Sequence, residues 1–421
     1  MARINIVKLS EIEEVKRFDA GRYRKSFLKL EKDLKKMTII RKLRHLVVEP
    51  VRTGYTPRDR DIYQNDTKIH LLKTDNLREG VINFENSDFL AARNLSESDY
   101  LKFKNVIVTI SGPHYDVIGK AAIFLDDYPP SVTNQNIAII KTDENFLNPF
   151  YLTIFLNSKY GREQLWMLSR QTGQFNLNCK EVEELQIPLL DADFQQEIET
   201  LVKNSFELIE KTKSLYSQAE KLLLEKLGLE GFQEKYELSY ATNLSKVFGV
   251  HRIDAEYFQT TYDRFMGCLK EHSKIVKLKE FILDFQKPKT LYKPKVGDFL
   301  LTKDVSLGTA YVVKEPVEEI AAGSILILKL DEDKIDKEYL ALCINSIIGD
   351  LQIRREGGGS VITHWRSEQI KNLQVPILYK KVQEEISSLI IQSHETKRRA
   401  KELWEETKRK VEKTIENEIQ K

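Results

Sequence analysis

Apolar residues recur at heptad-like spacing through residues 194–227, a stretch that contains no glycine or proline. One stripe consists of Ile198, Leu201, Ser205, Leu208, Thr212, Leu215, Ala219 and Leu222, and a second consists of Val202, Phe206, Ile209, Tyr216 and Leu223. Two adjacent stripes predict a long helix whose apolar face is too broad for a simple two-stranded seam. At about 1.5 Å per residue this helix would be roughly 50 Å long, so it needs a partner helix.

The second half of the chain repeats the pattern of the first. With an offset of 188 positions, residues 137–198 align without a gap to residues 325–386. The identical pairs include Tyr151/Tyr339, Asn157/Asn345, Ser158/Ser346, Gly161/Gly349, Gln164/Gln352 and Pro188/Pro376. Residues 17–20 match residues 252–255 with an offset of 235, which indicates 47 extra residues in the first copy, around residues 49–99.

The repeat also supplies a partner for the long helix, because residues 382–419 again lack glycine and proline and carry an apolar stripe. We therefore predict an α+β fold with two tandem globular α/β domains, residues 1–190 and 231–378. Two long helices, residues 191–230 and 379–421, would separate them and form an intramolecular antiparallel coiled coil. The chain as a whole would be a pseudo-two-fold internal repeat.

Shorter elements follow from periodicity and turn residues. Helices are predicted at residues 11–37 and 147–168. Strands are predicted at residues 69–72, 81–84, 106–110, 121–125, 137–141 and 185–190. Residues 170–178 (RQTGQFNLN) are predicted to be a loop.

Composition is that of an ordinary soluble protein of 421 residues, with 31% charged residues and a net charge of +2 that indicates no particular partner. Cys179, Cys268 and Cys343 are too far apart in sequence for a disulfide framework, which fits a reducing compartment. The polar N-terminus is unlike a signal peptide, and no apolar run approaches about 20 residues. We expect a cytoplasmic protein without a membrane segment. The basic stretch at residues 22–44 fits a DNA-backbone contact and a solvated helix face equally well.

No motif supports a metal site, a cofactor or a catalytic residue: the chain has no HExxH and no GxxxxGK[ST] phosphate loop. Residues 148–151 (NPFY) are similar to the Asn-Pro-Pro-Tyr/Phe loop of adenine methyltransferases. Alternatively, Asn148 is a helix N-cap and Pro149 the first helical residue. The second copy has Asp336 at this position, which keeps a capping residue without the amide and favours the cap. Residues 111–114 (SGPH) are interpreted as a turn rather than as a nucleophile beside a base.

Several segments resemble the specificity (S) subunit of type I restriction–modification systems. They include VIVTISGPHYDVIGKAAIF, NPFYLTIFLNSKYG and LYSQAEKLLLEKLGL in the first copy, and RIDAEYF and GDFLLTKDVSLGTAYVV in the second. TGYTPRDRDIYQND resembles the Gly-Thr-Pro region of such recognition domains, and the second copy lacks it. The resemblance implies a noncatalytic subunit with two target-recognition domains, each reading one half of a bipartite, non-palindromic site. The implied partners are double-stranded DNA, two methyltransferase (M) subunits and restriction (R) subunits, with the helices as spacer and docking surface.

Basic, aromatic and amide residues on the predicted loops are the candidates for contacting DNA, because arginine can read guanine and amides can read adenine. The first domain offers Arg52, Tyr55, Thr56, Arg58, Arg60, Lys73, Arg78, His114, Tyr115, Lys120, Gln174 and Asn176. The second offers Lys287, Lys289, Tyr292, Lys303, Thr309, Arg354, Arg355, His364 and Arg366. Two alternative functions stay open: a stand-alone DNA adenine methyltransferase, and a coiled-coil scaffold without DNA affinity.

Overall fold

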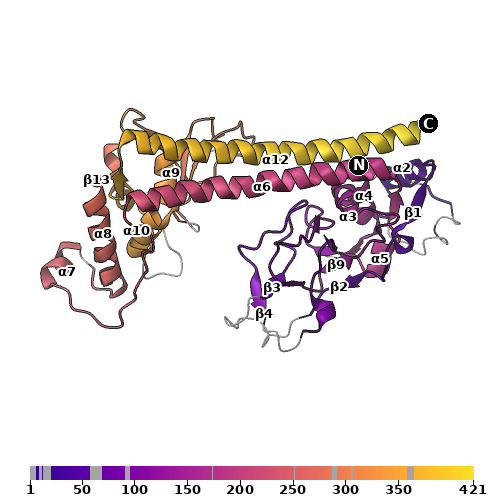
Figure 1. The fold of residues 1–421 in the computed structure, drawn as a ribbon, viewed down its shortest axis with the longest axis horizontal. Coiled ribbons are helices and arrows are strands. Elements are labelled where there is room, and N and C mark those ends of the chain that lie inside the picture. Colours follow the sequence, from indigo (N-terminus) through magenta and orange to yellow (C-terminus); the bar gives the residue numbers. More distant parts are fainter. Residues whose placement is uncertain are drawn as a thin grey trace. The chain divides into compact units, whose positions relative to one another are not determined.

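The computed structural model describes residues 6–8, 12, 20–56, 69–90, 95–172, 174–250, 252–286, 292–304, 307–357 and 365–421. The chain forms two compact units. Unit 1 consists of residues 1–207 and 399–421, and unit 2 consists of residues 208–398. Each unit thus combines one globular region with part of each of the two long helices, α6 (Ala192–Lys226) and α12 (Lys380–Gln420) (Figure 1). Both long helices are confirmed. Within the described residues, no helix has the length and apolar character needed to cross a bilayer.

The core of unit 1 is a four-stranded antiparallel sheet. Its strands, in sheet order, are β2 (Arg52–Thr53), β9 (Ile137–Ile140), β5 (Val106–Thr109) and β7 (Ala121–Ile123). The last three are buried along their whole length, so they are continuous apolar runs rather than alternating ones. Helix α3 (Pro149–Asn157), itself fully buried, packs on β5 and β7. The predicted strands at residues 106–110, 121–125 and 137–141 are confirmed.

A second sheet in unit 1 takes two of its strands, β3 and β4, from the segment that the second copy lacks. Its order is β4 (Asp88–Leu90), β3 (Ile69–Leu72) and β8 (Ser131–Thr133), with β3 and β8 parallel. The strand predicted at residues 69–72 is therefore correct. The strand predicted at residues 81–84 is wrong, because only Ile82 pairs, through one bridge to Leu77.

Both predicted shorter helices of the first copy are interrupted. Among the described residues, α2 (Lys25–Leu34) is a regular helix, and residues 20–23 before it form a turn. Residues 147–168 form two helices, α3 and α4 (Lys159–Leu168), because Ser158 is extended with φ −71° and ψ 165°. The Ser158 hydroxyl donates to the Phe155 carbonyl at 2.6 Å and caps the N–H of Gly161. At Gly161 a Cβ atom would lie 2.2 Å from the Phe155 oxygen, so the sharp break requires glycine there.

Unit 2 is built on the same plan. Its sheet, in order, consists of β14 (Ile282–Gln286), β17 (Ile325–Leu330), β15 (Phe299–Thr302) and β16 (Ala310–Val312). Its helices are α7 (Leu244–Val250), α8 (Thr260–His272), α9 (Lys337–Asn345), α10 (Ile347–Gly357) and α11 (Ser367–Lys371). Strand β13 (Lys274–Lys277) pairs with β18 (Gln374–Ile377) in the register that β1 (Ile40–Lys42) and β12 (Gln186–Pro188) have in unit 1.

The residues shared by the two copies make the same buried hydrogen bonds. The Tyr151 hydroxyl donates to the Pro188 carbonyl at 2.7 Å, and the Tyr339 hydroxyl donates to the Pro376 carbonyl at 2.8 Å. The Asn157 amide pairs with both backbone groups of Ala121, as Asn345 does with Ala310. Gln164 and Gln352 likewise bond both backbone groups of Gln186 and Gln374. Because an unpaired buried polar group is costly, these side chains and their partners are constrained together.

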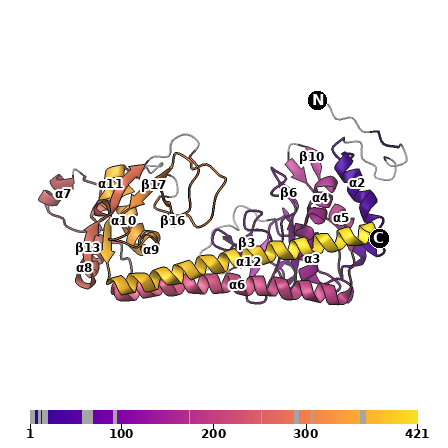
Figure 2. The same ribbon diagram turned by 90° about the horizontal axis from the view of Figure 1, so that it is seen from above.

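The long helices pair antiparallel in each unit (Figures 1 and 2). In unit 1 the Ser205 hydroxyl donates to the Ala400 carbonyl at 3.3 Å, and Lys410 pairs with Glu197 further along. In unit 2 the Ser393 hydroxyl donates to the Thr212 carbonyl at 2.9 Å. Positions 205 and 393 are equivalent in the repeat, and so are 212 and 400. The same contact therefore occurs twice, which confirms the predicted intramolecular antiparallel pairing and the internal repeat.

A third contact recurs with donor and acceptor exchanged. The amide of Asn148 donates to the Glu199 carboxylate at 2.5 Å, and its oxygen caps α3 by accepting from Phe150 N–H. At the equivalent positions of unit 2, the Ser387 hydroxyl donates to the Asp336 carboxylate at 2.5 Å. Asp336 caps α9 in the same way. The two copies thus keep a hydrogen bond between equivalent positions, but the donor position in unit 1 is the acceptor position in unit 2.

This exchange predicts that Asn148→Asp destabilises unit 1 by about 1–3 kcal/mol, because its new carboxylate would face Glu199, which is only 8% exposed. Adding Glu199→Ser should restore most of the loss by recreating the pair of unit 2. The penalty should shrink as the pH falls toward about 4, where one of the two carboxyls binds a proton. Urea unfolding at several pH values measures this.

Asp336→Asn is the matched control, since an amide oxygen can still cap α9 and accept from Ser387. We expect it to cost less than about 1 kcal/mol. If Asn148→Asp lowered the free energy of unfolding equally with and without Glu199→Ser, the exchange of donor and acceptor would not explain the loss.

Candidate nucleic-acid interface

The strand register brings many of the first-domain candidates to one edge of the unit 1 sheet. Strand β2 ends and β9 begins at this edge, because Thr53 pairs with Ala138. Strand β5 also ends here, where Thr109 pairs with Ile137, and β7 begins here. Tyr55 and Thr56 follow β2, and Lys120 precedes β7. Tyr55 N–H donates to the Thr133 carbonyl at 2.8 Å, which fixes the chain as it leaves the sheet.

The predicted loop at residues 170–178 is instead a β-hairpin that extends this edge. Strands β10 (Arg170–Thr172) and β11 (Gln174–Asn176) pair with each other, and β11 pairs with β6 (Ser111–Gly112). Residues 111–112 are therefore a strand rather than a turn, and the turn follows at residues 115–119. The Ser111 hydroxyl donates to the Asn176 side-chain oxygen at 2.6 Å. Gln174 and Asn176 are exposed beside Ser111, and the exposed His114 follows β6.

Tyr115 has mainly a packing role. Its ring lies 4.2 Å from the Trp166 ring, and the Arg162 guanidinium lies 5.3 Å from the Tyr115 ring. Burial raises the pKa of Tyr115. Arg24 also stacks on Trp166, with its guanidinium 4.9 Å from the ring. Arg22 is buried and pairs with Glu31 at 2.5 Å. These two arginines of the basic stretch at residues 22–44 are thus occupied by intramolecular contacts.

The remaining first-domain candidates differ in their charge partners. Lys73, at the end of β3, pairs with Asp88. By contrast, no ion pair within the described residues involves Arg52, Arg78 or Lys120. A basic side chain without a carboxylate partner can neutralise a phosphate without first giving up an ion pair.

Amides in the turn that opens β9 were missed by sequence reasoning. Gln135 is exposed at the same edge, and Asn136 N–H donates to the Asn134 side chain at 3.1 Å. The signal was available, since three consecutive amide residues (NQN) directly precede a predicted strand.

Unit 2 presents an equivalent edge with different side chains. Lys303 follows β15 and Thr309 precedes β16. Lys303 N–H donates to the Ser324 carbonyl at 2.9 Å, and Trp365 N–H donates to the Lys303 carbonyl at 2.9 Å. In unit 1 Ile110 makes the corresponding bonds with Asn136 and Leu177. Arg366, next to Trp365, is therefore brought to this edge with Lys303 and Thr309, although Lys303 pairs with Asp304 at 2.6 Å.

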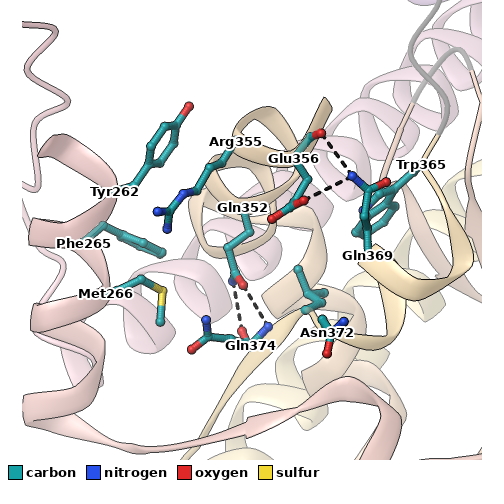
Figure 3. Close-up of a pocket in the computed structure, with 11 residues that line it drawn as sticks. Tyr262, Phe265, Met266, Gln352, Arg355, Glu356, Trp365, Gln369, Asn372 and Gln374 are labelled. Atoms are coloured by element: carbon teal, nitrogen blue, oxygen red, sulfur yellow. Dashed lines mark hydrogen bonds between the residues drawn. The ribbon is translucent and has the colours of Figure 1, made fainter. Parts of the chain in front are cut away.

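Three second-domain candidates are occupied by contacts within the protein. Tyr292 donates to Asp298, ahead of β15, at the opposite edge, and this hydrogen bond raises its pKa to about 12. Arg354 pairs with Glu234 at 2.7 Å. Arg355 lies in a small cleft between α8, α10 and α11, where it points toward Tyr262 (Figure 3). It also donates to the Tyr257 carbonyl at 3.1 Å.

Several side chains that line the cleft around Arg355 are hydrogen-bonded within the protein. Gln352 bonds both backbone groups of Gln374, and the Gln369 amide donates to the carbonyl and the carboxylate of Glu356 (Figure 3). The guanidinium of Arg355 is thus occupied within the protein, and its DNA-binding role stays a prediction.

Five candidates, Arg58, Arg60, Lys287, Lys289 and His364, lie outside the described residues. Asn148 is the predicted helix N-cap, with its amide bonded to Glu199. In the described part of the chain, no group of three or more histidine, cysteine, aspartate or glutamate side chains could hold a metal ion.

No family model and no curated protein sequence matches the chain. Solved structures do match. The S subunit of a type I restriction–modification system from M. genitalium covers 90% of this chain and 95% of its own, with 14% identity and a TM-score of 0.44. The HsdS subunit from Thermoanaerobacter tengcongensis covers 91% and 95%, with 13% identity and a TM-score of 0.29.

A further structure, from work on complex assembly and conformational transition of the type I R-M system, covers 90% of this chain and 97% of its own. Its identity is 13% and its TM-score 0.33. The chain is similar to type I restriction–modification S subunits.

If the edge of the unit 1 sheet contacts DNA, Lys120→Ala should weaken DNA binding and lower the slope of log affinity against log salt by about 1. The matched control is Lys141→Ala, which removes the same charge at the opposite end of β9, where Lys141 is exposed. Fluorescence anisotropy across a salt series measures both slopes. Equal effects of the two substitutions would contradict the assignment of the interface to this edge.

Proposed function

We propose that the protein is the DNA-binding specificity subunit of a type I restriction–modification complex and is not itself an enzyme. Its recognition domains would be residues 1–190 and 231–378, each reading one half of a bipartite, non-palindromic site. The observation that carries the proposal is the repeated sheet edge, where Ile110 and Lys303 make the same backbone hydrogen bonds. The edge carries Tyr55, Lys120, Gln174 and Asn176 in one unit and Lys303, Thr309 and Arg366 in the other. The family resemblance in sequence supports it.

The chemistry of these side chains predicts which would contact phosphates and which would contact bases. Lysine and arginine at the edges would neutralise phosphates and set the register on the duplex. The amides of Gln174 and Asn176 can pair with adenine in the major groove, and Arg366 can pair with guanine. Since the two edges carry different groups, the two half-sites would differ. A net charge of only +2 favours weak binding by the chain alone and stronger binding in a complex.

The long helices, residues 191–230 and 379–421, would act as spacer and as docking surface for two methyltransferase subunits and for restriction subunits in the cytoplasm. The apolar stripes of α6 are covered within the chain, since Val202, Phe206 and Leu223 are buried. Partner subunits would therefore dock on the outer faces of the helix pair. A helix pair of roughly 50 Å, against about 34 Å per turn of DNA, favours half-sites about one turn or a little more apart.

Footprinting of the chain in complex with a type I methyltransferase subunit tests the proposal. Two protected segments separated by an unprotected gap are expected. A scaffold without DNA affinity would leave the DNA unprotected. Robust methyl transfer by the chain alone, with S-adenosylmethionine and DNA, would instead favour the stand-alone methyltransferase.

The spacer role predicts the result of lengthening both helices. Seven residues inserted after Leu208 and seven after Thr396, which are equivalent positions, add two turns and keep the apolar stripes in phase. At about 1.5 Å per residue the insertion spans roughly 10 Å, or about three base pairs. Site selection should return the same half-sites with a gap about three base pairs longer. Changed half-site sequences would contradict the spacer role.

A further inference from the structure

A tight turn at residues 76–83 carries Arg78 and belongs to the segment that the second copy lacks. Asn83 N–H donates to the Asn76 carbonyl at 2.8 Å, and Arg78 N–H donates to the Val81 carbonyl at 2.9 Å. Leu77 and Ile82 bridge each other at its base and are buried in the core of unit 1. The turn follows directly on the strand that ends before Lys73. Arg78 lies in the turn, and Lys73 is tied to its base because Lys73 N–H donates to the Asn76 side-chain oxygen at 2.7 Å.

The tip of this turn is held between strand β7 and helix α12. Gly80 has φ +80°, and its N–H donates to the Ala121 carbonyl at 2.9 Å. A Cβ atom at Gly80 would lie 2.1 Å from Cη2 of Trp404, so the backbone of the turn rests directly on the indole. Trp404 is only 7% exposed and stacks on Phe206 with ring centroids 6.4 Å apart. The indole is thereby fixed by the helix pair while it supports the turn.

A charge pair next to the indole holds the same tip. Lys408, one turn along α12, pairs with Glu79 at 2.9 Å and with Glu405 at 2.9 Å. Its side chain is only 15% exposed, and burial alone would lower its pKa. The hydrogen bonds to the two carboxylates outweigh burial and leave the pKa of Lys408 above its ordinary value. The amine is therefore charged, and the pair is better shielded from water than an ordinary surface ion pair.

We propose that Trp404 and Lys408 are positioning residues for DNA recognition by the first domain. They hold the 76–83 turn against β7, and so place Arg78 and Lys73 relative to the sheet edge that carries Lys120. The inference rests on the proposed function. By sequence, α12 follows the second domain, so the end of the chain would determine how precisely the first half-site is read.

The internal repeat provides a matched control for this role. The position equivalent to Trp404 is Tyr216 on α6, and the position equivalent to Lys408 is Glu220. Tyr216 also packs under a recognition domain, beside Tyr311 and Asn345 of unit 2. Replacing Tyr216 should disturb the helix pair to a similar degree, but it leaves the 76–83 turn untouched.

The experiment is site selection on DNA with each half-site randomised in turn, using the chain in complex with a methyltransferase subunit. Trp404→Ala should reduce discrimination at the first half-site roughly tenfold, the order that one base contact supplies, and leave the second half-site unchanged. Trp404→Phe should retain most of the discrimination, because a ring still supports Gly80. Tyr216→Ala should spare the first half-site.

Charge exchange tests the ion pair, including the case in which Trp404→Ala does not fold. Glu79→Lys and Lys408→Glu should each reduce discrimination at the first half-site, and the double variant should recover it. Hydrogen exchange without DNA should be faster at residues 76–83 in Trp404→Ala and unchanged there in Tyr216→Ala.

Equal loss at both half-sites in Trp404→Ala, or unchanged exchange at residues 76–83, would overturn the positioning role. If the unsubstituted complex selected no bipartite site, the proposed function would fail. The exchange result would still test the contact between the turn and α12.

Discussion

Each unit of this protein depends on a helix segment that comes from the other copy of the repeat. Residues 399–421 complete unit 1, and residues 208–226 of α6 belong to unit 2. The apolar stripe of a long helix cannot remain exposed, and neither globular region can cover it alone. The contacts of Ser205 with Ala400 and of Ser393 with Thr212 use small residues, which let the two backbones approach closely. Pairing within the chain therefore couples the folding of each half to the other.

What the two copies share is a set of buried hydrogen bonds rather than a surface. Tyr151, Asn157 and Gln164 and their equivalents each bond a backbone group that would otherwise be buried and unpaired. Such groups tolerate change only in pairs, as the exchange of Asn148 and Glu199 for Asp336 and Ser387 illustrates. The edges of the two sheets are not constrained in this way. Their side chains have diverged while the backbone bonds beneath them have stayed the same.

This distinction explains which predictions from sequence succeed. The long helices, the antiparallel pairing, the repeat and the cap at Asn148 are confirmed, because heptad spacing and capping are local signals that packing reinforces. The helix break at Ser158 is missed because its cause is a close approach at Gly161, which periodicity does not register. The 170–178 hairpin is missed because β11 also pairs with β6, which lies far away in sequence. Arg355 resembles a DNA-binding residue in sequence because a charge pattern does not reveal a tyrosine beneath the guanidinium.

The extra segment of the first copy makes the two sheet edges unequal in support as well as in chemistry. In unit 1 the second sheet and the 76–83 turn join the edge through β8 and Ala121, and α12 buttresses the turn from outside. In unit 2 the described residues include no strand beside β16 other than β15. A reading surface that is braced on more sides loses less entropy when it orders against DNA, and discriminates more sharply for the same contacts. The two sheet edges therefore differ in preorganisation, and the contact between the Trp404 indole and Gly80 is one source of the difference.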